Sequence, residues 1–247
     1  MCRLLFAMAM LLSVFSTQVA ICQDKITEIV LASEAWPNAT NTDGTGLYWE
    51  IFKAVYEPVG IQVKHRISSY AGSEELVKRQ KVDGMVAAYL DEVENAIFPK
   101  SHFSVDVIQV LFKKDKVAEW KGQESISGKN IGWIKEYDFD QYMDVPLKKV
   151  EFDERKDALR VLDKDRIDFF MDAQPDLIEA LDSGVIDLAN YRRETVKQLN
   201  LYLAFVNTEK GKRLQEIFDE RFPQLVQSGE IKKLFDKWQG GNFTYPF

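Results

Sequence analysis

The side chains best suited to chemistry are carboxylates and aromatic rings that follow apolar, strand-like runs. Asp172 comes directly after the run Ile167–Met171, and Tyr89 ends the run Val82–Tyr89. A carboxylate in a partly dry cleft binds a cation far more strongly than in water, because the local dielectric constant is low. An aromatic ring can stack on a flat or cationic group. The pattern favours binding of a cation, with a helix cap as the alternative role for Asp172.

Further candidates lie near the ends of the first three predicted strands. They are Glu34, Trp36, Tyr70, Ala88 and Glu94. For the acids Asp91, Glu92 and Glu94, the alternative is the first turn of a helix, where the backbone dipole favours carboxylates. Ala88 and its neighbour Ala87 offer backbone groups to a ligand, unless they are buried by packing alone.

The sequence offers little for catalysis by histidine or cysteine. The two histidines, His65 and His102, are isolated from each other, so we expect neither a histidine metal site nor a catalytic triad. Both cysteines, Cys2 and Cys22, fall within an N-terminal segment that we expect to be removed, which leaves a mature chain without thiols. We therefore predict no catalytic residue, no metal site and no cofactor.

The N-terminus predicts an exported protein. Arg3 precedes the apolar stretch Leu4–Val14, and Ala20 and Cys22 supply small side chains at the positions that a signal peptidase requires. We expect a signal peptide over residues 1–22, a mature chain that begins at the next residue, and a periplasmic location. A membrane anchor is one alternative, although the segment is short for a bilayer. Lipid modification of Cys22 is the other.

Composition excludes some partners. The 247 residues include 32 basic and 39 acidic side chains, for a formal net charge of −7. The acidic residues are dispersed, which indicates a soluble chain and argues against a nucleic acid as partner. The chain without its leader is long enough for one large domain or two smaller lobes with cores of their own.

Strand-like and helix-like segments alternate along the chain. The predicted strands are 26–32, 61–67, 82–89, 107–112, 148–152, 167–171 and 199–206. The predicted helices are 48–56, 74–80, 155–163, 173–181 and an apolar stripe from 214 to 226 that Pro223 should kink or interrupt. Such alternation is typical of α/β proteins with parallel sheets.

Four segments in a fixed order resemble a known family. They are FPKSHFS (98–104), SGKNIGW (127–133), RIDFFMD (166–172) and SGEIKKLFDKW (228–238). Together they resemble the extracellular solute-binding proteins of family 3, the polar-amino-acid-binding type, over residues 26–238.

This resemblance implies an α/β, two-lobed type II periplasmic-binding-protein-like fold. Lobe one would comprise residues 24–112 and 206–247, and lobe two residues 113–205. Two strands would cross between the lobes, near Leu111–Lys114 and Leu203–Asn207. The ligand would lie in the cleft, at the carboxyl ends of the strands.

The resemblance also implies roles for individual residues. It gives Asp172 the contact with the ammonium group of the ligand, and it puts Tyr89 and the acids after it beside the ligand. Trp36 and Pro37 match an early loop of the family that contacts the ligand.

Two departures from the family bear on the ligand. Relatives hold the α-carboxylate of an amino acid with an arginine, but this chain has no arginine between Arg79 and Arg155. Tyr137 and Asp138 stand where the family has a turn of small residues that meets the same carboxylate. Both departures favour an amine-bearing or neutral ligand over an acidic amino acid.

The function that this resemblance implies is that of a non-enzymatic, periplasmic solute-binding protein. It would act as a monomer, capture a small amine-bearing or amino-acid-like ligand, and deliver it to an ABC-type permease. One alternative is ligand sensing for a chemoreceptor or another signalling partner. A third possibility is an enzyme similar to the periplasmic cyclohexadienyl dehydratases, with Glu34 or Glu94 as the general acid.

Overall fold

The computed structural model describes residues 25–247, so the predicted signal peptide lies outside the described residues. The strands are β1 (Glu28–Ser33), β2 (Gln62–Ile67), β3 (Gly84–Ala88), β4 (Ala96–Ile97), β5 (Ser104–Lys113), β6 (Asn130–Ile134), β7 (Lys148–Phe152), β8 (Phe169–Ala173) and β9 (Tyr191–Val206). The α-helices are α1 (Leu47–Tyr56), α2 (Tyr70–Lys78), α3 (Arg155–Asp163), α4 (Gln174–Asp182), α5 (Glu209–Gln227) and α6 (Glu230–Lys237). None of these helices is both long enough and apolar enough to cross a bilayer.

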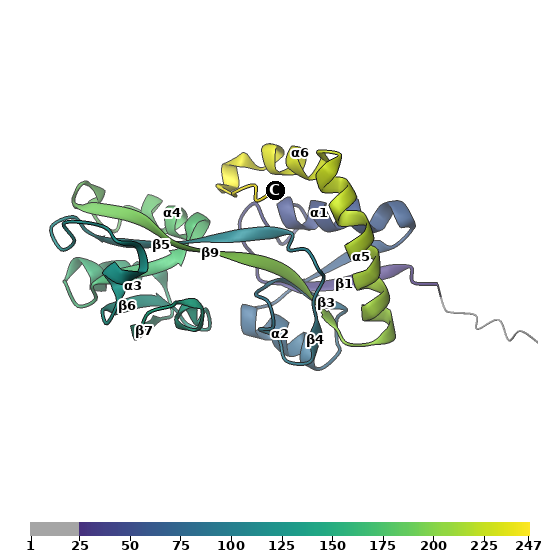
Figure 1. Ribbon diagram of the computed structural model, residues 1–247, viewed down its shortest axis with the longest axis horizontal. Helices are drawn as coiled ribbons and strands as arrows, with labels where there is room; N and C mark the ends of the chain where they lie inside the picture. The colour runs from purple at the N-terminus through teal and green to yellow at the C-terminus, as the bar shows by residue number, and fades with distance from the viewer. Residues whose placement is uncertain (1–24) are drawn as a thin grey trace, which may run out of the picture.

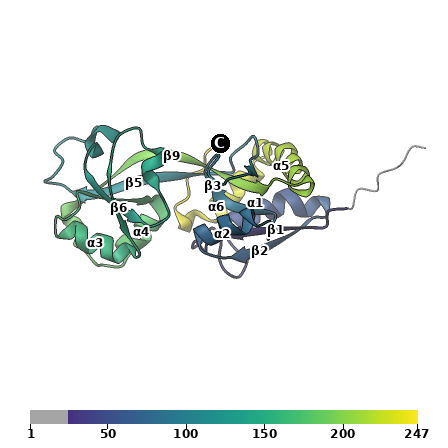
Figure 2. The same cartoon turned by 90° about the horizontal axis from the view of Figure 1, so that it is seen from below.

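The elements form two lobes joined by β5 and β9 (Figure 1). Lobe one holds β1 to β4 with α1, α2, α5 and α6, and lobe two holds β6 to β8 with α3 and α4. The strand order is β2-β1-β3-β9-β5-β8-β6-β7, with β4 paired to β9. In each lobe the strands that alternate with helices pair in parallel, β1 with β2 and β3, and β6 with β7 and β8. The view from below separates the same two groups of elements (Figure 2).

The long strands β5 and β9 carry the connection between the lobes. They pair with each other from Ser104 opposite Leu201 to Lys113 opposite Tyr191. β9 also pairs with β3 in lobe one, from Tyr202 onward. β5 pairs on its other edge with β8 in lobe two, from Ile108 to Leu111. The exact lobe boundaries remain a prediction.

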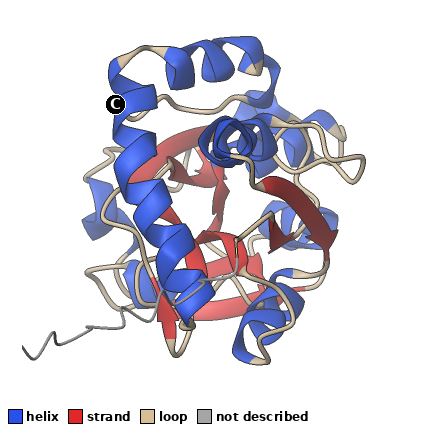
Figure 3. Cartoon of the chain, turned by 90° about the vertical axis from the view of Figure 1, so that its right-hand side faces the viewer, coloured by secondary structure: helices blue, strands red, loops and turns tan. Residues whose placement is uncertain are grey.

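Helix α1 has apolar residues on nearly every side, and it packs against α5, α6 and β2 within lobe one. Its buried residues include Trp49, Phe52 and Tyr56. The hydroxyl of Tyr56 donates to the carbonyl of Leu214 at 3.0 Å, so this buried polar group is satisfied. When the right-hand side of the Figure 1 view is turned toward the viewer, helices lie around the strands (Figure 3).

Strands β3 and β8 are buried along their whole length, as parallel strands covered on both faces should be. Their apolar runs were visible in the sequence, and the structure confirms both strands to within a few residues. Pro223 lies inside α5 without ending it, so of the two predicted effects of this proline, a kink or an interruption, the interruption does not occur. Residues 90–95 form turns, so the acids there do not begin a helix.

Candidate ligand-binding site

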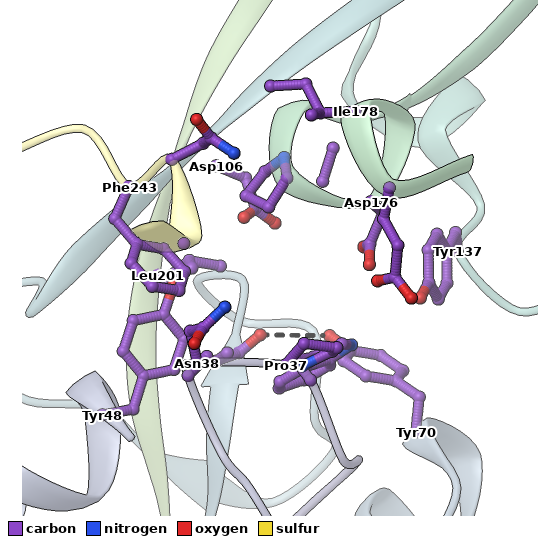
Figure 4. Close-up of a pocket in the computed structure, with 18 of the residues that line it drawn as sticks. Pro37, Asn38, Tyr48, Tyr70, Asp106, Tyr137, Asp176, Ile178, Leu201 and Phe243 are labelled. Atoms are coloured by element: carbon purple, nitrogen blue, oxygen red, sulfur yellow. Dashed lines mark hydrogen bonds between the residues drawn. The ribbon is translucent and has the colours of Figure 1, made fainter. Parts of the chain in front are cut away.

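A cavity of about 260 Å³ lies in the cleft between the lobes. Lobe one contributes the loop after β1, the first residues of α1 and α2, and the end of β3, while lobe two contributes the loop after β6 and the start of α4. The connecting strands add Asp106 from β5 and Leu201 from β9 (Figure 4). The wall thus gathers segments that follow the carboxyl ends of parallel strands, where open α/β sheets bind ligands.

Four aromatic residues predicted from the sequence line this cavity, namely Trp36, Tyr70, Tyr89 and Tyr137. The ring centroids of Trp36 and Tyr70 lie 6.2 Å apart, and those of Tyr70 and Tyr137 also lie 6.2 Å apart. Tyr70 belongs to lobe one and Tyr137 to lobe two, so the aromatic wall spans the cleft. Rings in this arrangement can surround a cation or a flat group.

Hydrogen bonds fix two of these tyrosines. The hydroxyl of Tyr70 donates to Glu92 Oε2 at 2.6 Å, and the same oxygen accepts the backbone N–H of Tyr89 at 2.8 Å. The hydroxyl of Tyr89 donates to Asp106 Oδ2 at 2.9 Å. Glu92 is therefore a structural anchor for the aromatic wall.

Strand β3 is irregular where it meets the cavity. Ala87 has a φ of 64°, and the pairing of β3 with β9 shifts register between Val86 and Ala88. Such bulges redirect a strand next to a binding site, at a cost in backbone strain for a residue with a side chain. Here the bulge brings Ala87 to the cavity wall, while Ala88 packs in a separate apolar cluster with Val77 and Met85.

The other predicted site residues lie outside the cavity wall. Glu34, Ala88, Glu94, Asp138 and Asp172 are not among its lining residues. Asp138 pairs with Lys149 at 2.8 Å, and Glu94 lies exposed in the turn after β3. Glu34 is half-buried beside the cavity, and this burial raises the pKa of its carboxyl group.

Asp172 does not present a free carboxylate to a ligand, contrary to the prediction. Its side chain is 0% exposed, Oδ2 accepts from Arg155 Nε at 2.8 Å, and Oδ1 accepts from the backbone N–H of Ala173 at 2.9 Å. Burial raises the pKa of Asp172, and the Arg155 guanidinium opposes that shift. Both oxygens are already used within the protein.

The sequence did not indicate a role for Arg155 at the site. The family's ligand-binding arginine belongs in the segment between Arg79 and Arg155, and Arg155 lies at the end of that segment. It lies at the start of α3, which packs beside β8, and it also contacts Asp176 Oδ2 at 3.1 Å and donates to the Tyr137 hydroxyl at 3.1 Å. One arginine is shared between two aspartates, Asp172 and Asp176. The cluster of Arg155, Asp172 and Asp176 therefore keeps a net negative charge when both carboxyl groups are ionised.

Four acids that the sequence analysis missed do line the cavity: Asp106, Asp176, Glu179 and Asp182. The last three are three residues apart on α4, and this spacing aligns them on one face of the helix. Burial raises the pKa of Asp106 to about 6. Burial also raises the pKa of Asp176, with Arg155 opposing the shift and the negative charge of Asp172 adding to it.

Two signals in the sequence pointed to these acids. Asp106 is a charged residue inside the otherwise largely apolar strand β5, and the regular spacing of acids on α4 marks a single helix face. Neither signal shows which way a side chain faces, because that depends on how β5 and α4 pack.

The cavity suits a positively charged ligand. Among its described lining residues, acids and aromatic rings occur together and no lysine, arginine or histidine is present. Residues 25–247 contain no group of three histidine, cysteine, aspartate or glutamate side chains arranged to hold a metal ion. Carboxylates and aromatic rings in one wall are groups that can bind an organic cation.

The sequence matches no protein-family model and no curated protein. Solved structures share the fold. A histidine kinase sensor domain with similarity to periplasmic binding proteins has a TM-score of 0.70 at 18% identity, covering 91% of this chain and 100% of that domain. The substrate-binding protein of an amino acid ABC transporter has a TM-score of 0.61 at 16% identity, covering 85% of this chain and 98% of the other.

A third similar structure is the GluR0 ligand-binding core in complex with L-glutamate, with a TM-score of 0.67 at 14% identity, covering 85% of this chain and 97% of the other. The chain has the two-lobed type II periplasmic-binding-protein fold. The predicted resemblance to family 3 solute-binding proteins is confirmed as a likeness of fold.

Proposed function

We propose that this protein is a periplasmic solute-binding protein that captures a small amine-bearing cation in the cleft between its lobes. One observation carries the proposal: Asp106 and Asp176 line a cavity walled by aromatic rings, with no basic side chain among the described lining residues. A cation entering this cavity exchanges water for carboxylates and ring faces in a region of low dielectric constant.

The same wall disfavours an acidic ligand. A free carboxylate in the cavity would lie near several acids and would lack a cationic partner, because Arg155 is engaged by Asp172 and Asp176. An unpaired buried charge costs on the order of several kcal/mol. An α-amino acid with a neutral side chain brings one carboxylate into this environment and should bind less tightly than a simple amine.

Asp172 is fully buried with both oxygens used, whereas Asp176 lines the cavity and contacts Arg155 through Oδ2, so we assign the ammonium contact to Asp106 and Asp176. Asp106 comes from a connecting strand and Asp176 from lobe two, so a cation between them would draw lobe two toward the rest of the cleft. Closure of this kind follows only from a ligand that interacts better with the closed state.

A thermal-shift screen followed by calorimetry tests the proposal. The panel contains putrescine, spermidine, choline, L-lysine and L-arginine, with L-glutamate and L-aspartate as acidic comparisons. We expect saturable binding of at least one amine and none of the two acids. Tight binding of glutamate or aspartate, or no response to any amine, would show that the cavity does not select cations.

The role of the bound ligand has two candidates that share this site. Delivery to an ABC-type permease is the first, and its test is loss of labelled amine uptake when the gene is deleted. Sensing is the second, supported by the similarity of fold to a kinase sensor domain along that domain's whole length. A gene-expression or motility response to the amine that persists without uptake would favour sensing. For the proposed absence of enzymatic activity, the test is whether NMR shows the amine unchanged after prolonged incubation.

A further inference from the structure

The C-terminal residues return to the ligand cavity after α6 ends. Gly240, Gly241, Asn242 and Phe243 all line the cavity, although the site is otherwise built from segments more than 35 residues away in sequence. Phe243 lies beside Tyr48, on the opposite side of the cavity from Asp176 and Tyr137 (Figure 4). No sequence motif pointed to this segment, which follows the last segment that resembled the family.

Aromatic contacts hold the segment in place. The ring centroid of Phe243 is 5.7 Å from that of Tyr48, and the ring of Tyr245 is 5.3 Å from Phe235. Phe247 stacks on His102 at 5.1 Å. Every second residue from Phe243 to Phe247 is therefore an aromatic anchor. Tyr48 and Phe235 lie on α1 and α6, and His102 precedes β5, so the segment is fixed to lobe one.

The turn that brings Phe243 to the cavity has particular backbone requirements. A Cβ at Gly241 would come within 2.1 Å of Phe243 Cε2, so the ring folds closely over this glycine. Asn242 has a φ of 56°, a left-handed conformation that asparagine tolerates better than most residues. The N–H of Gly241 donates to the carbonyl of Trp238 at 2.9 Å and ties the turn to the end of α6.

We propose that the C-terminal segment Gly240–Phe243 forms one wall of the ligand site and that Phe243 determines which amines fit. This inference rests on the proposed function, since it concerns the same cavity. Phe243 closes the side of the cavity that faces away from Asp176, and its ring, together with Tyr48, offers an apolar surface to the part of the ligand away from that carboxylate. Its truncation enlarges the cavity there and leaves the acids untouched.

The test compares putrescine with the longer amine spermidine by calorimetry on the full mature chain. The variants are Phe243→Ala and the matched control Thr244→Ala, which changes the next residue of the segment outside the cavity lining. We expect Phe243→Ala to weaken putrescine binding by about tenfold and to shift the putrescine-to-spermidine preference toward spermidine. Thr244→Ala should keep both affinities within about twofold. Unchanged affinities and preference in Phe243→Ala overturn the proposal.

A second measurement needs no ligand and separates this inference from the proposed function. Hydrogen exchange of the backbone amides of Trp36, Asn38 and Ala39, which also line the cavity, is compared in the full mature chain and in a chain that ends at Trp238. Faster exchange in the shortened chain, with unchanged circular dichroism, supports the inference that Gly240–Phe243 form one wall of the cavity. This holds even if the wild-type protein binds neither amine. Identical exchange overturns it. Failure of both amines to bind wild type counts against the proposed function alone.

Discussion

Protonation of Asp106 as the pH falls from about 7 to about 5 should by itself weaken amine binding by about tenfold. Burial raises the pKa of this carboxyl to about 6, although the Tyr89 hydroxyl donates to it. With that pKa, about nine-tenths of the free protein carries an ionised Asp106 near pH 7 and about one-tenth near pH 5. Only the ionised form attracts an ammonium group, so protonation of Asp106 raises the apparent dissociation constant by the same factor, or ~1.4 kcal/mol. Burial also raises the pKa of Asp176, the second assigned contact, so its protonation adds to this effect.

The same titration acts in the opposite direction on the ligand-free protein. A carboxyl whose pKa is raised on folding binds more protons in the folded chain than in the unfolded chain. Its contribution to stability is therefore present at low pH and is lost as the pH rises from its ordinary pKa of 3.8 through about 6. We expect a loss of about 1 to 3 kcal/mol over this range from Asp106 alone. An added amine offsets this loss, so the thermal shift it causes should grow with pH.

Calorimetry with the tightest amine from the screen checks both the pH effect and its source. Primary amines keep their charge throughout this range, so only the protein titrates. Asp106→Asn should weaken binding near pH 7 by about 2 to 5 kcal/mol and should lose the tenfold part of the pH effect that comes from Asp106. Asp138→Asn is the matched control, because this carboxylate pairs with Lys149 outside the cavity lining. A wild-type affinity independent of pH, or an Asp106→Asn variant that keeps the full effect, would refute the reasoning.

Three further outcomes are expected. Arg155→Met should reduce the free energy of unfolding by about 3 to 5 kcal/mol in denaturant titrations, because it leaves the buried Asp172 unpaired. The double variant that also carries Asp172→Asn should recover part of this loss. An Arg155→Met variant as stable as wild type would contradict the ion pair between Arg155 and Asp172. Small-angle scattering with saturating amine should give a smaller radius of gyration than without it, and an unchanged profile would argue against ligand-driven closure. Intact mass of the exported protein should match a chain that begins at Gln23, whereas a mass that includes residues 1–22 or a lipid on Cys22 would contradict cleavage there.

Much of the fold could be predicted from the sequence because its signals are local. The apolar runs of β3 and β8 and their alternation with helices are properties of neighbouring residues, and they predict parallel α/β architecture. Trp36, Tyr70 and Tyr89 were predicted in a similar way, because Trp36 and Tyr70 follow predicted strands, Tyr89 ends one, and the carboxyl ends of parallel strands meet at one edge of a sheet. Tyr137 was predicted from the family resemblance.

The charges at the site could not be assigned in this way. Asp172 has the right position in sequence to bind an ammonium group, but the packing of α3 beside β8 brings Arg155 to 2.8 Å from it and uses its carboxylate within the protein. Asp106 faces the cavity because β5 runs between the lobes, and Phe243 reaches the cavity because the last residues turn back against α1 and α6.

By itself, the sequence determined most of the segments that become strands and helices, since secondary structure follows largely from the periodicity of neighbouring side chains. Only the tertiary structure decided which carboxylates are free to meet a ligand. The availability of a charge depends on partners that are distant in the chain: Arg155 and the N–H of Ala173 use both oxygens of the buried Asp172, whereas Asp106 and Asp176 line the cavity.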